Sequence, residues 1–179
     1  MLPPGATHVV VSCGGNDAFG QLGTLQEKTT TLITALGRFS DLRGDFNVLY
    51  SRMLDRLLRS GMRIAVCTIY DAIPGMDLAA LCAIALYNDV IVRRAAIAGV
   101  AVLELRAVCV CPEDYSAVSP IEPSSIGGAK IARLIDAFYR DARVLLFCGG
   151  AVCITSVHAA VNANFRPFSE CVAARARSC

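Results

Sequence analysis

The chain has 179 residues, of which 55% are hydrophobic and 18% are charged, and its formal net charge is only +2. A chain of this length and composition can bury a sizeable core, which excludes intrinsic disorder. The low net charge, the absence of tryptophan and the lack of any lysine- or arginine-rich run argue against a nucleic-acid partner, because such proteins normally carry a basic surface interleaved with aromatic residues.

Three continuous apolar runs predict buried β-strands. They cover residues 7–13, 62–69 and 100–105. Strands that are apolar along their whole length are buried on both faces of a sheet, and helices between them indicate parallel pairing. We therefore expect an α/β fold, with an open parallel sheet in a three-layer α/β/α sandwich.

Three helices are predicted from apolar residues at helical spacing. The first covers residues 46–58, with Asp45 as its N-cap. The second covers residues 77–98 and ends at Gly99, and the third covers residues 128–140. These helices and the three strands form one expected domain over residues 1–140.

Functional residues are expected at one edge of this sheet, because ligands of open α/β sheets bind beyond the carboxyl ends of the strands. The relevant loops follow Cys13, Ile69 and Leu105. Asn88 and Asp89 are poor helix formers in the middle of the second predicted helix, and we expect them to face the loop after Ile69.

Residues 141–179 form a tail of different character. Residues 144–161 are strongly apolar but include Gly149, Gly150 and His158. Three interpretations stay open: a membrane segment, which the internal glycines and histidine disfavour, a hairpin of residues 143–147 and 151–157, or a tail that is foreign to the fold. No signal peptide is visible at the N-terminus, so a cytoplasmic location is the default expectation.

Nine cysteines are scattered along the chain without Cys-x-x-Cys pairs or histidines at metal-ligand spacing. The pattern favours buried thiols over a disulfide framework or a zinc site. Cys109 and Cys111 are expected to be structural, and so is Cys13, although it lies next to a glycine-rich turn. We expect no metal ion and no cofactor.

Two motifs resemble the SGNH (GDSL-type) hydrolase family. One is Gly14-Gly15-Asn16-Asp17 after a strand, like the family's Gly-x-Asn-Asp block, and the other is Ser119-Pro120-Ile121-Glu122-Pro123-Ser124 before Gly127-Gly128. The resemblance covers about residues 6–140. It implies a flavodoxin-like sheet and serine-dependent hydrolysis of a small-molecule ester.

The resemblance also implies roles for individual residues. Gly14 shapes the turn, and the Asn16 amide donates a hydrogen bond to the oxyanion that forms during ester hydrolysis. Glu122 takes the position of the family's catalytic base, and three polar residues of the same loops are expected to contact substrate. These three are Asp17, Asp71 and Ser119. Asp71, like Asp114, is also typical of a simple turn.

The chain departs from the family in two places. No Gly-Asp-Ser nucleophile block exists in it, and thirteen residues before Gly14 are too few for the two strands that precede this block in the family, so the domain is expected to lack its first two strands. The last block has Ser119 and Glu122 where the family has Asp and His. We therefore expect little or no esterase activity from the isolated chain.

A non-catalytic role is the alternative hypothesis. A sheet without two strands exposes the edge of the strand at residues 7–13, and an open apolar edge pairs readily with another chain or with a second copy. The domain would then be an interaction module or a membrane-associated remnant.

Overall fold

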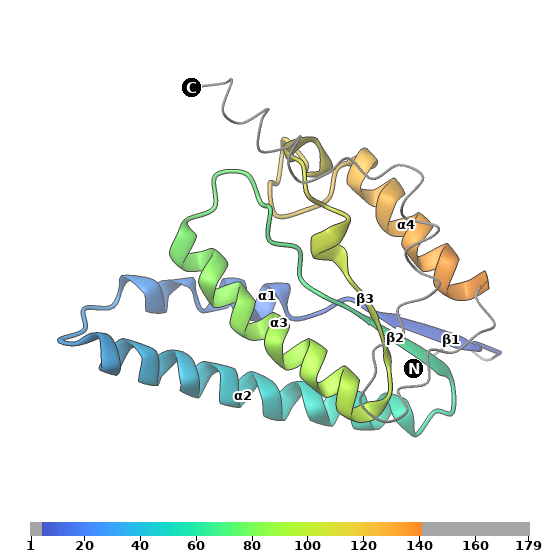
Figure 1. Cartoon of the computed structure of the whole chain (residues 1–179), viewed down its shortest axis with the longest axis horizontal. Helices are drawn as coiled ribbons and strands as arrows, with labels where there is room; N and C mark the ends of the chain where they lie inside the picture. Colours follow the sequence, from blue (N-terminus) through green and yellow to red (C-terminus); the bar gives the residue numbers. More distant parts are fainter. Residues whose placement is uncertain (1–4, 141–179) are drawn as a thin grey trace. The chain divides into compact units, whose positions relative to one another are not determined.

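The structure, a computed structural model, describes residues 5–140 (Figure 1). The chain divides into two compact units. The first consists of residues 5–71 and 75–104 and holds the β-sheet with three α-helices. The second consists of residues 72–74 and the described chain from residue 105 onward, and holds the last α-helix. The predicted tail at residues 141–179 lies outside the described residues.

The sheet of the first unit has three parallel strands in the order β1 (His8–Val11), β2 (Arg63–Cys67) and β3 (Ala101–Leu103). The registers place Val11 beside Val66, and Val66 beside Val102. The predicted α/β chain with a parallel sheet is therefore confirmed.

The strands differ in burial because of their places in the sheet. Four of the five residues of the central strand β2 are buried. All residues of β1 are only half-buried, so the expectation of a buried first strand is wrong. The reason is that β1 is an edge strand among the described residues, and a strand at an edge has fewer neighbours than a central one.

A short helix, α1 (Gly15–Gly20), follows Gly14, where a tight loop was predicted. A 3-10 helix at Leu22–Gln26 comes directly after it. Segments this short contain too few apolar positions to show a helical repeat in the sequence.

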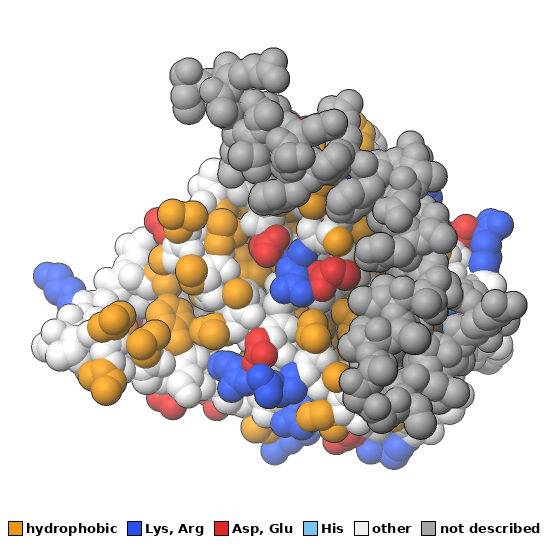
Figure 2. All heavy atoms as spheres, viewed as in Figure 1, with side chains coloured by type: hydrophobic (Ala, Val, Ile, Leu, Met, Phe, Trp, Pro, Cys, Tyr) orange, Lys and Arg blue, Asp and Glu red, His pale blue; other side chains and the backbone are white. Residues whose placement is uncertain are grey.

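Helix α2 (Leu32–Leu58) begins much earlier than predicted. Its N-cap is Thr31, whose side chain accepts a hydrogen bond from the backbone N–H of Thr34 at 3.2 Å, so the predicted cap at Asp45 is wrong. The first turns carry exposed apolar residues instead of a buried stripe, which hides the start of the helix from sequence patterning. These residues are Leu32, Ile33 and Leu36, and Figure 2 shows apolar side chains on this part of the surface.

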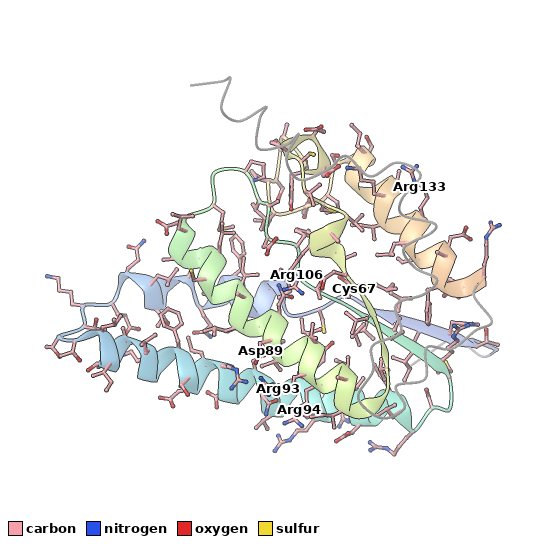
Figure 3. The ribbon with its side chains drawn as sticks, in the orientation of Figure 1. Cys67, Asp89, Arg93, Arg94, Arg106 and Arg133 are labelled. Carbon is pink, nitrogen blue, oxygen red and sulfur yellow. The ribbon has the colours of Figure 1, made fainter. Side chains whose placement is uncertain are left out.

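Helix α3 (Leu78–Ala98) has the predicted ends, with Asp77 as N-cap and Gly99 in the left-handed conformation at its C-terminus. It lies beside α2 (Figures 1 and 3). Asp89 accepts hydrogen bonds from Arg43 of α2 at 2.6 Å and from Arg93 at 3.0 Å. The expectation that Asp89 faces the loop after Ile69 is therefore wrong, because its carboxylate joins two helices.

The ion pairs of Asp89 predict a small pH effect on stability. Hydrogen bonds from Arg43 and Arg93 hold the pKa of Asp89 below its usual range. A depressed pKa in the folded state stabilises the fold above the unfolded pKa of about 4, and this contribution disappears as the pH falls through the folded pKa.

We expect Asp89→Asn to cost at most about 1 kcal/mol at pH 7, because the pair is largely exposed to solvent. The cost should shrink as the pH falls below about 4, which urea unfolding at pH 7 and at pH 3 would measure. An equal cost at both pH values would contradict this explanation.

The second unit contains 3-10 helices at Leu105–Ala107 and Pro112–Asp114 and the helix α4 (Ser125–Arg140). The strand predicted at residues 100–105 therefore ends at Leu103. The helix predicted at residues 128–140 begins at Ser125. Leu134 and Phe138 are buried, on the face of α4 that the sequence predicts. Within residues 5–140, no helix combines the length and the apolar character needed to cross a membrane.

Candidate functional site

Gly14 shapes the turn between β1 and α1. Its φ angle of 103° lies in the left-handed region, which favours glycine. A Cβ atom at this position would lie 2.9 Å from Cζ of Phe46 and 3.4 Å from Cδ1 of Ile69. The turn therefore requires glycine twice, for its conformation and for its close contact with α2 and with the chain after β2.

Asn16 and Asp17 lie in the first turn of α1, directly beyond the carboxyl end of β1. Both residues are exposed, and neither side chain makes a hydrogen bond to another described residue. The backbone N–H of Ala18 donates to the carbonyl of Gly14 at 2.9 Å and closes the turn. The side-chain amide of Asn16 is thus presented to solvent as a donor at the predicted edge of the sheet.

Two polar residues that the sequence did not mark as site residues, Thr68 and Glu104, lie at the carboxyl ends of β2 and β3. Thr68 is buried, and its hydroxyl donates to Oε1 of Glu104 at 2.7 Å. Asp71 follows in the same loop as Thr68 and is half-buried. Both residues fall inside the strands predicted at 62–69 and 100–105, and only the earlier ends of β2 and β3 place them beyond the strands.

Asn88 holds the chain at the end of β2 from within α3. Its Oδ1 accepts a hydrogen bond from the N–H of Ile69 at 2.7 Å, and its Nδ2 donates to the carbonyl of Ile69 at 2.8 Å. The expectation that Asn88 faces the loop after Ile69 is confirmed. A buried asparagine in mid-helix therefore satisfies both backbone polar groups of Ile69, just beyond the end of β2.

Cys13 directly precedes the Gly14 turn, and Cys67 is the last residue of β2. Burial, followed by the negative charge of Asp17, raises the pKa of Cys13, although the residue as a whole is exposed. Burial and then the neighbouring Cys13 raise the pKa of Cys67 to about 11. Both groups are therefore protonated thiols at neutral pH, which argues against a nucleophilic Cys13.

The hydroxyl of Tyr50 is buried, and it has no hydrogen-bond partner among the described residues. Burial raises the pKa of Tyr50, with smaller contributions from Cys13 and Cys67. A buried hydroxyl without a partner costs roughly 1–3 kcal/mol of desolvation.

We expect Tyr50→Phe to stabilise the protein by about 1 kcal/mol, because it removes this cost and keeps the ring that packs on Phe46. Thermal and urea unfolding would measure the change. Tyr87→Phe is a matched comparison in the same aromatic cluster. A loss of stability on Tyr50→Phe would show that the hydroxyl has a partner.

Ser119 and Glu122 belong to a turn in the second unit. The N–H of Glu122 donates to the carbonyl of Ser119 at 2.9 Å, and its own carbonyl accepts from the N–H of Ser116 at 2.8 Å. The carboxylate of Glu122 is exposed and makes no hydrogen bond to another described residue. The two residues are thus joined through their backbones, and their side chains do not form a Ser–Glu pair.

Asp114 organises the second unit. Its side chain is fully buried, accepts hydrogen bonds from the N–H groups of Val110 and Cys111 at 3.1 Å, and pairs with Nζ of Lys130 at 2.6 Å. Its carbonyl accepts a hydrogen bond from the N–H of Ser124 at 2.8 Å. Asp114 therefore has a structural role, as its turn-forming sequence context indicated.

Ser124 and Gly127 explain the second motif in structural terms. The hydroxyl of Ser124 donates to the carbonyl of Glu113 at 2.6 Å and accepts from the N–H groups of Ile126 and Gly127, so it caps α4. Gly127 lies against the backbone of Asp114 so closely that a Cβ atom would overlap its carbonyl oxygen. The motif thus docks the start of α4 on the 3-10 helix that contains Asp114.

The structure therefore divides the predicted site residues between the two units. Gly14, Asn16, Asp17 and Asp71 follow strands of the first unit, and Ser119 and Glu122 lie in the second. Comparison of the chain with models of known families, with curated proteins and with solved structures finds no match. The candidate site therefore depends on local geometry and on the motifs themselves.

The described part of the chain offers no conventional metal site. Within residues 5–140, no group of three or more His, Cys, Asp or Glu side chains is placed to hold a metal ion. What the described arrangement offers is hydrogen bonding, through the exposed amide of Asn16 and the polar side chains at the strand ends.

Proposed function

We propose that the chain is an ester hydrolase domain of the SGNH type. The observation that carries the proposal is the Gly14 turn, which presents the Asn16 amide beyond the carboxyl end of a parallel strand. A donor held in this way can stabilise the negative charge that forms on a carbonyl oxygen during ester hydrolysis. The substrate class is a small-molecule acyl ester.

The order of the strands also supports the proposal. A flavodoxin-like sheet has the order 2-1-3-4-5, and three adjacent parallel strands in chain order would correspond to its strands 3-4-5. On this assignment, strands 2 and 1 would lie beyond the outer edge of β1, and the complete domain would be a three-layer sandwich. Among the described residues, β1 pairs only with β2.

The proposed mechanism needs a serine that this chain does not place in a Gly-Asp-Ser block. In a complete enzyme, that serine would attack the ester carbonyl and form an acyl-enzyme, which water then hydrolyses. Asn16 would donate to the oxyanion in both steps. Glu122 would take the place of the base, and its exposed carboxylate is a weak one in water.

The isolated chain should release no p-nitrophenol from short-chain p-nitrophenyl esters above the background rate. The decisive experiment extends the reading frame upstream of Met1 in the source DNA and looks for a Gly-Asp-Ser block. If the block is present, the extended protein should hydrolyse these esters, and Asn16→Ala should lower kcat by about 10²- to 10³-fold.

Gln21→Ala, in the exposed chain just beyond α1, is the control that should keep full activity. Glu122→Gln tests the base in the same assay. If activity survives Asn16→Ala, then Asn16 does not stabilise the oxyanion. A frame without the nucleophile block would favour the second candidate, a non-catalytic interaction domain, for which the observation is the outer edge of β1.

A further inference from the structure

Helix α3 carries apolar residues on its exposed side as well as on its buried side. A helix that buries one face normally has polar residues on the opposite one. On α3, however, Leu78 is 79% exposed and Ile97 is 70% exposed. The charged residues of this helix are Asp89, Arg93 and Arg94 alone. Its exposed side therefore combines apolar side chains with one charged cluster, and the proposed hydrolysis uses neither.

The start of α2 adds exposed apolar residues to the same side of the first unit. Leu32 is 76% exposed and lies three helical turns before Arg43, so the two residues share a face of α2. Leu78 lies three turns before Asp89 on α3 in the same way. Arg43 and Asp89 are hydrogen-bonded and the two helices run in the same direction, so both leucines lie on the side of this ion pair (Figure 1). Figure 2 shows apolar and basic side chains over α3 and the first turns of α2.

The charged cluster between the two helices contains more arginines than acids. Arg43 donates to Oδ2 of Asp89 from Nε at 3.1 Å and from Nη2 at 2.6 Å, and Arg93 donates to Oδ1 at 3.0 Å. Arg94 donates from Nε to the neutral amide oxygen of Asn47 at 2.6 Å. Figure 3 shows Asp89, Arg93 and Arg94 close together along α3. Three guanidinium groups thus share one carboxylate, which leaves the cluster with a net charge of +2.

The nearest acidic residues of α2 do not neutralise this cluster. Asp41 and Asp45 lie two residues before and two residues after Arg43. Residues two apart on a helix do not face each other, so both carboxylates belong to another side of α2. Glu27, which precedes α2, already pairs with Arg38. The excess positive charge is therefore available to a partner from outside the chain.

We infer that this surface, the α2–α3 face, docks on an anionic lipid membrane. The face consists of three basic and three apolar residues: Arg43, Arg93, Arg94, Leu32, Leu78 and Ile97. The arginines contact the anionic headgroups, and the apolar side chains enter the boundary between headgroups and acyl chains. The inference concerns binding alone and does not rest on the proposed esterase activity.

The layout of the face favours a lipid surface over a protein partner. Leu78 and Ile97 lie near the two ends of α3, about 28 Å apart along the helix axis, with the arginines between them. A broad, flat surface that offers both negative charge and apolar depth can contact all these side chains at once. A second copy of the chain would bring the same positive cluster, and like charges repel.

The test is a flotation assay with the full-length protein and lipid vesicles. One set of vesicles contains phosphatidylcholine with 30% phosphatidylserine, and the other contains phosphatidylcholine alone. The protein is expected to float with the first set and not with the second, and added salt should weaken its binding, because salt screens the attraction.

Two double variants test the two components of the face. Arg93→Gln with Arg94→Gln should lower the partition coefficient by about 25-fold, because each arginine near an anionic surface contributes about fivefold. Leu78→Ser with Ile97→Ser should lower it by at least about fivefold, since less apolar area is buried. Arg93→Lys with Arg94→Lys keeps the charge and should keep most of the binding.

Arg52→Gln with Arg56→Gln is the matched control, because it removes the same charge from the same unit. Arg52 lies nine residues after Arg43, which places it on the opposite side of α2. Both arginines are exposed, and this variant should leave the partition nearly unchanged.

Circular dichroism checks that every variant folds, and the Leu78/Ile97 variant alone carries the test if the arginine variant does not. Failure of the wild-type protein to bind the anionic vesicles overturns the inference and leaves an acidic protein as the partner. Binding that the control variant weakens as much as the Arg93/Arg94 variant also overturns it, because another surface is then responsible. Self-association without vesicle binding, abolished by Ile97→Ser, would identify a second copy as the partner instead.

Discussion

Gly127→Ala is expected to destabilise the protein by roughly 3 kcal/mol or more, which corresponds to a fall in Tm of about 10 °C. The Cα of Gly127 lies directly against the carbonyl of Asp114, so an added methyl group would overlap this oxygen. A backbone atom cannot rotate away as a side chain can. The same carbonyl accepts the hydrogen bond from Ser124, so a shift of the helix would also disturb the α4 cap.

Gly128→Ala is the matched control, one residue further along the same helix. Nothing lies within 4 Å of a Cβ at this position, and alanine is the better helix former by about 1 kcal/mol. We therefore expect opposite signs from two adjacent glycines in thermal unfolding. Equal effects would mean that α4 does not dock on Asp114 as described.

Asn88→Asp is expected to cost about 3 kcal/mol at pH 7, with a strong dependence on pH. The buried amide of Asn88 both donates to and accepts from the peptide of Ile69. A carboxylate cannot donate, so it would face the carbonyl of Ile69 as an unpaired buried charge. A protonated carboxyl group can donate and accept, and it would restore both hydrogen bonds.

The pKa of the introduced carboxyl group determines how the cost changes with pH. Burial and the facing carbonyl would raise the pKa of the introduced group, and a raised pKa stabilises the folded state only below the unfolded value. The cost of Asn88→Asp should therefore be much smaller at pH 4 than at pH 7, measured by urea unfolding against wild type at each pH. Asn47→Asp is the comparison, because its Oδ1 accepts a hydrogen bond from Arg94 and a carboxylate there gains a positive partner, so no comparable loss at pH 7 is expected. A cost that does not change with pH would contradict the described geometry.

Helix and strand positions followed from the sequence wherever a pattern was long and regular. The ends of α3 were predicted correctly because Asp77 and Gly99 act through local hydrogen bonding and local backbone conformation. The start of α2 was missed because its first turns expose Leu32 and Ile33, so no buried stripe marks them. The odd placement of Asn88 was noticed, and its loop partner was predicted correctly, whereas Asp89 pairs with Arg43 on another helix.

In the candidate site, too, the sequence marks features set by neighbouring residues and misses contacts between distant ones. The motifs around Gly14 and Gly127 could be found in the sequence, because turns and tight contacts select glycine locally. The Thr68–Glu104 hydrogen bond could not, since its two members are far apart in the chain.

By itself, then, the sequence determined the three strands, most of α3 and α4, the second half of α2 and the parallel α/β class, all of which depend on residues close together in the chain. The tertiary structure alone decided that Asp114 is a buried structural carboxylate, that Glu122 is exposed and that the Tyr50 hydroxyl has no partner within residues 5–140. Burial and hydrogen bonding depend on which distant segments meet, and a single sequence does not specify those contacts.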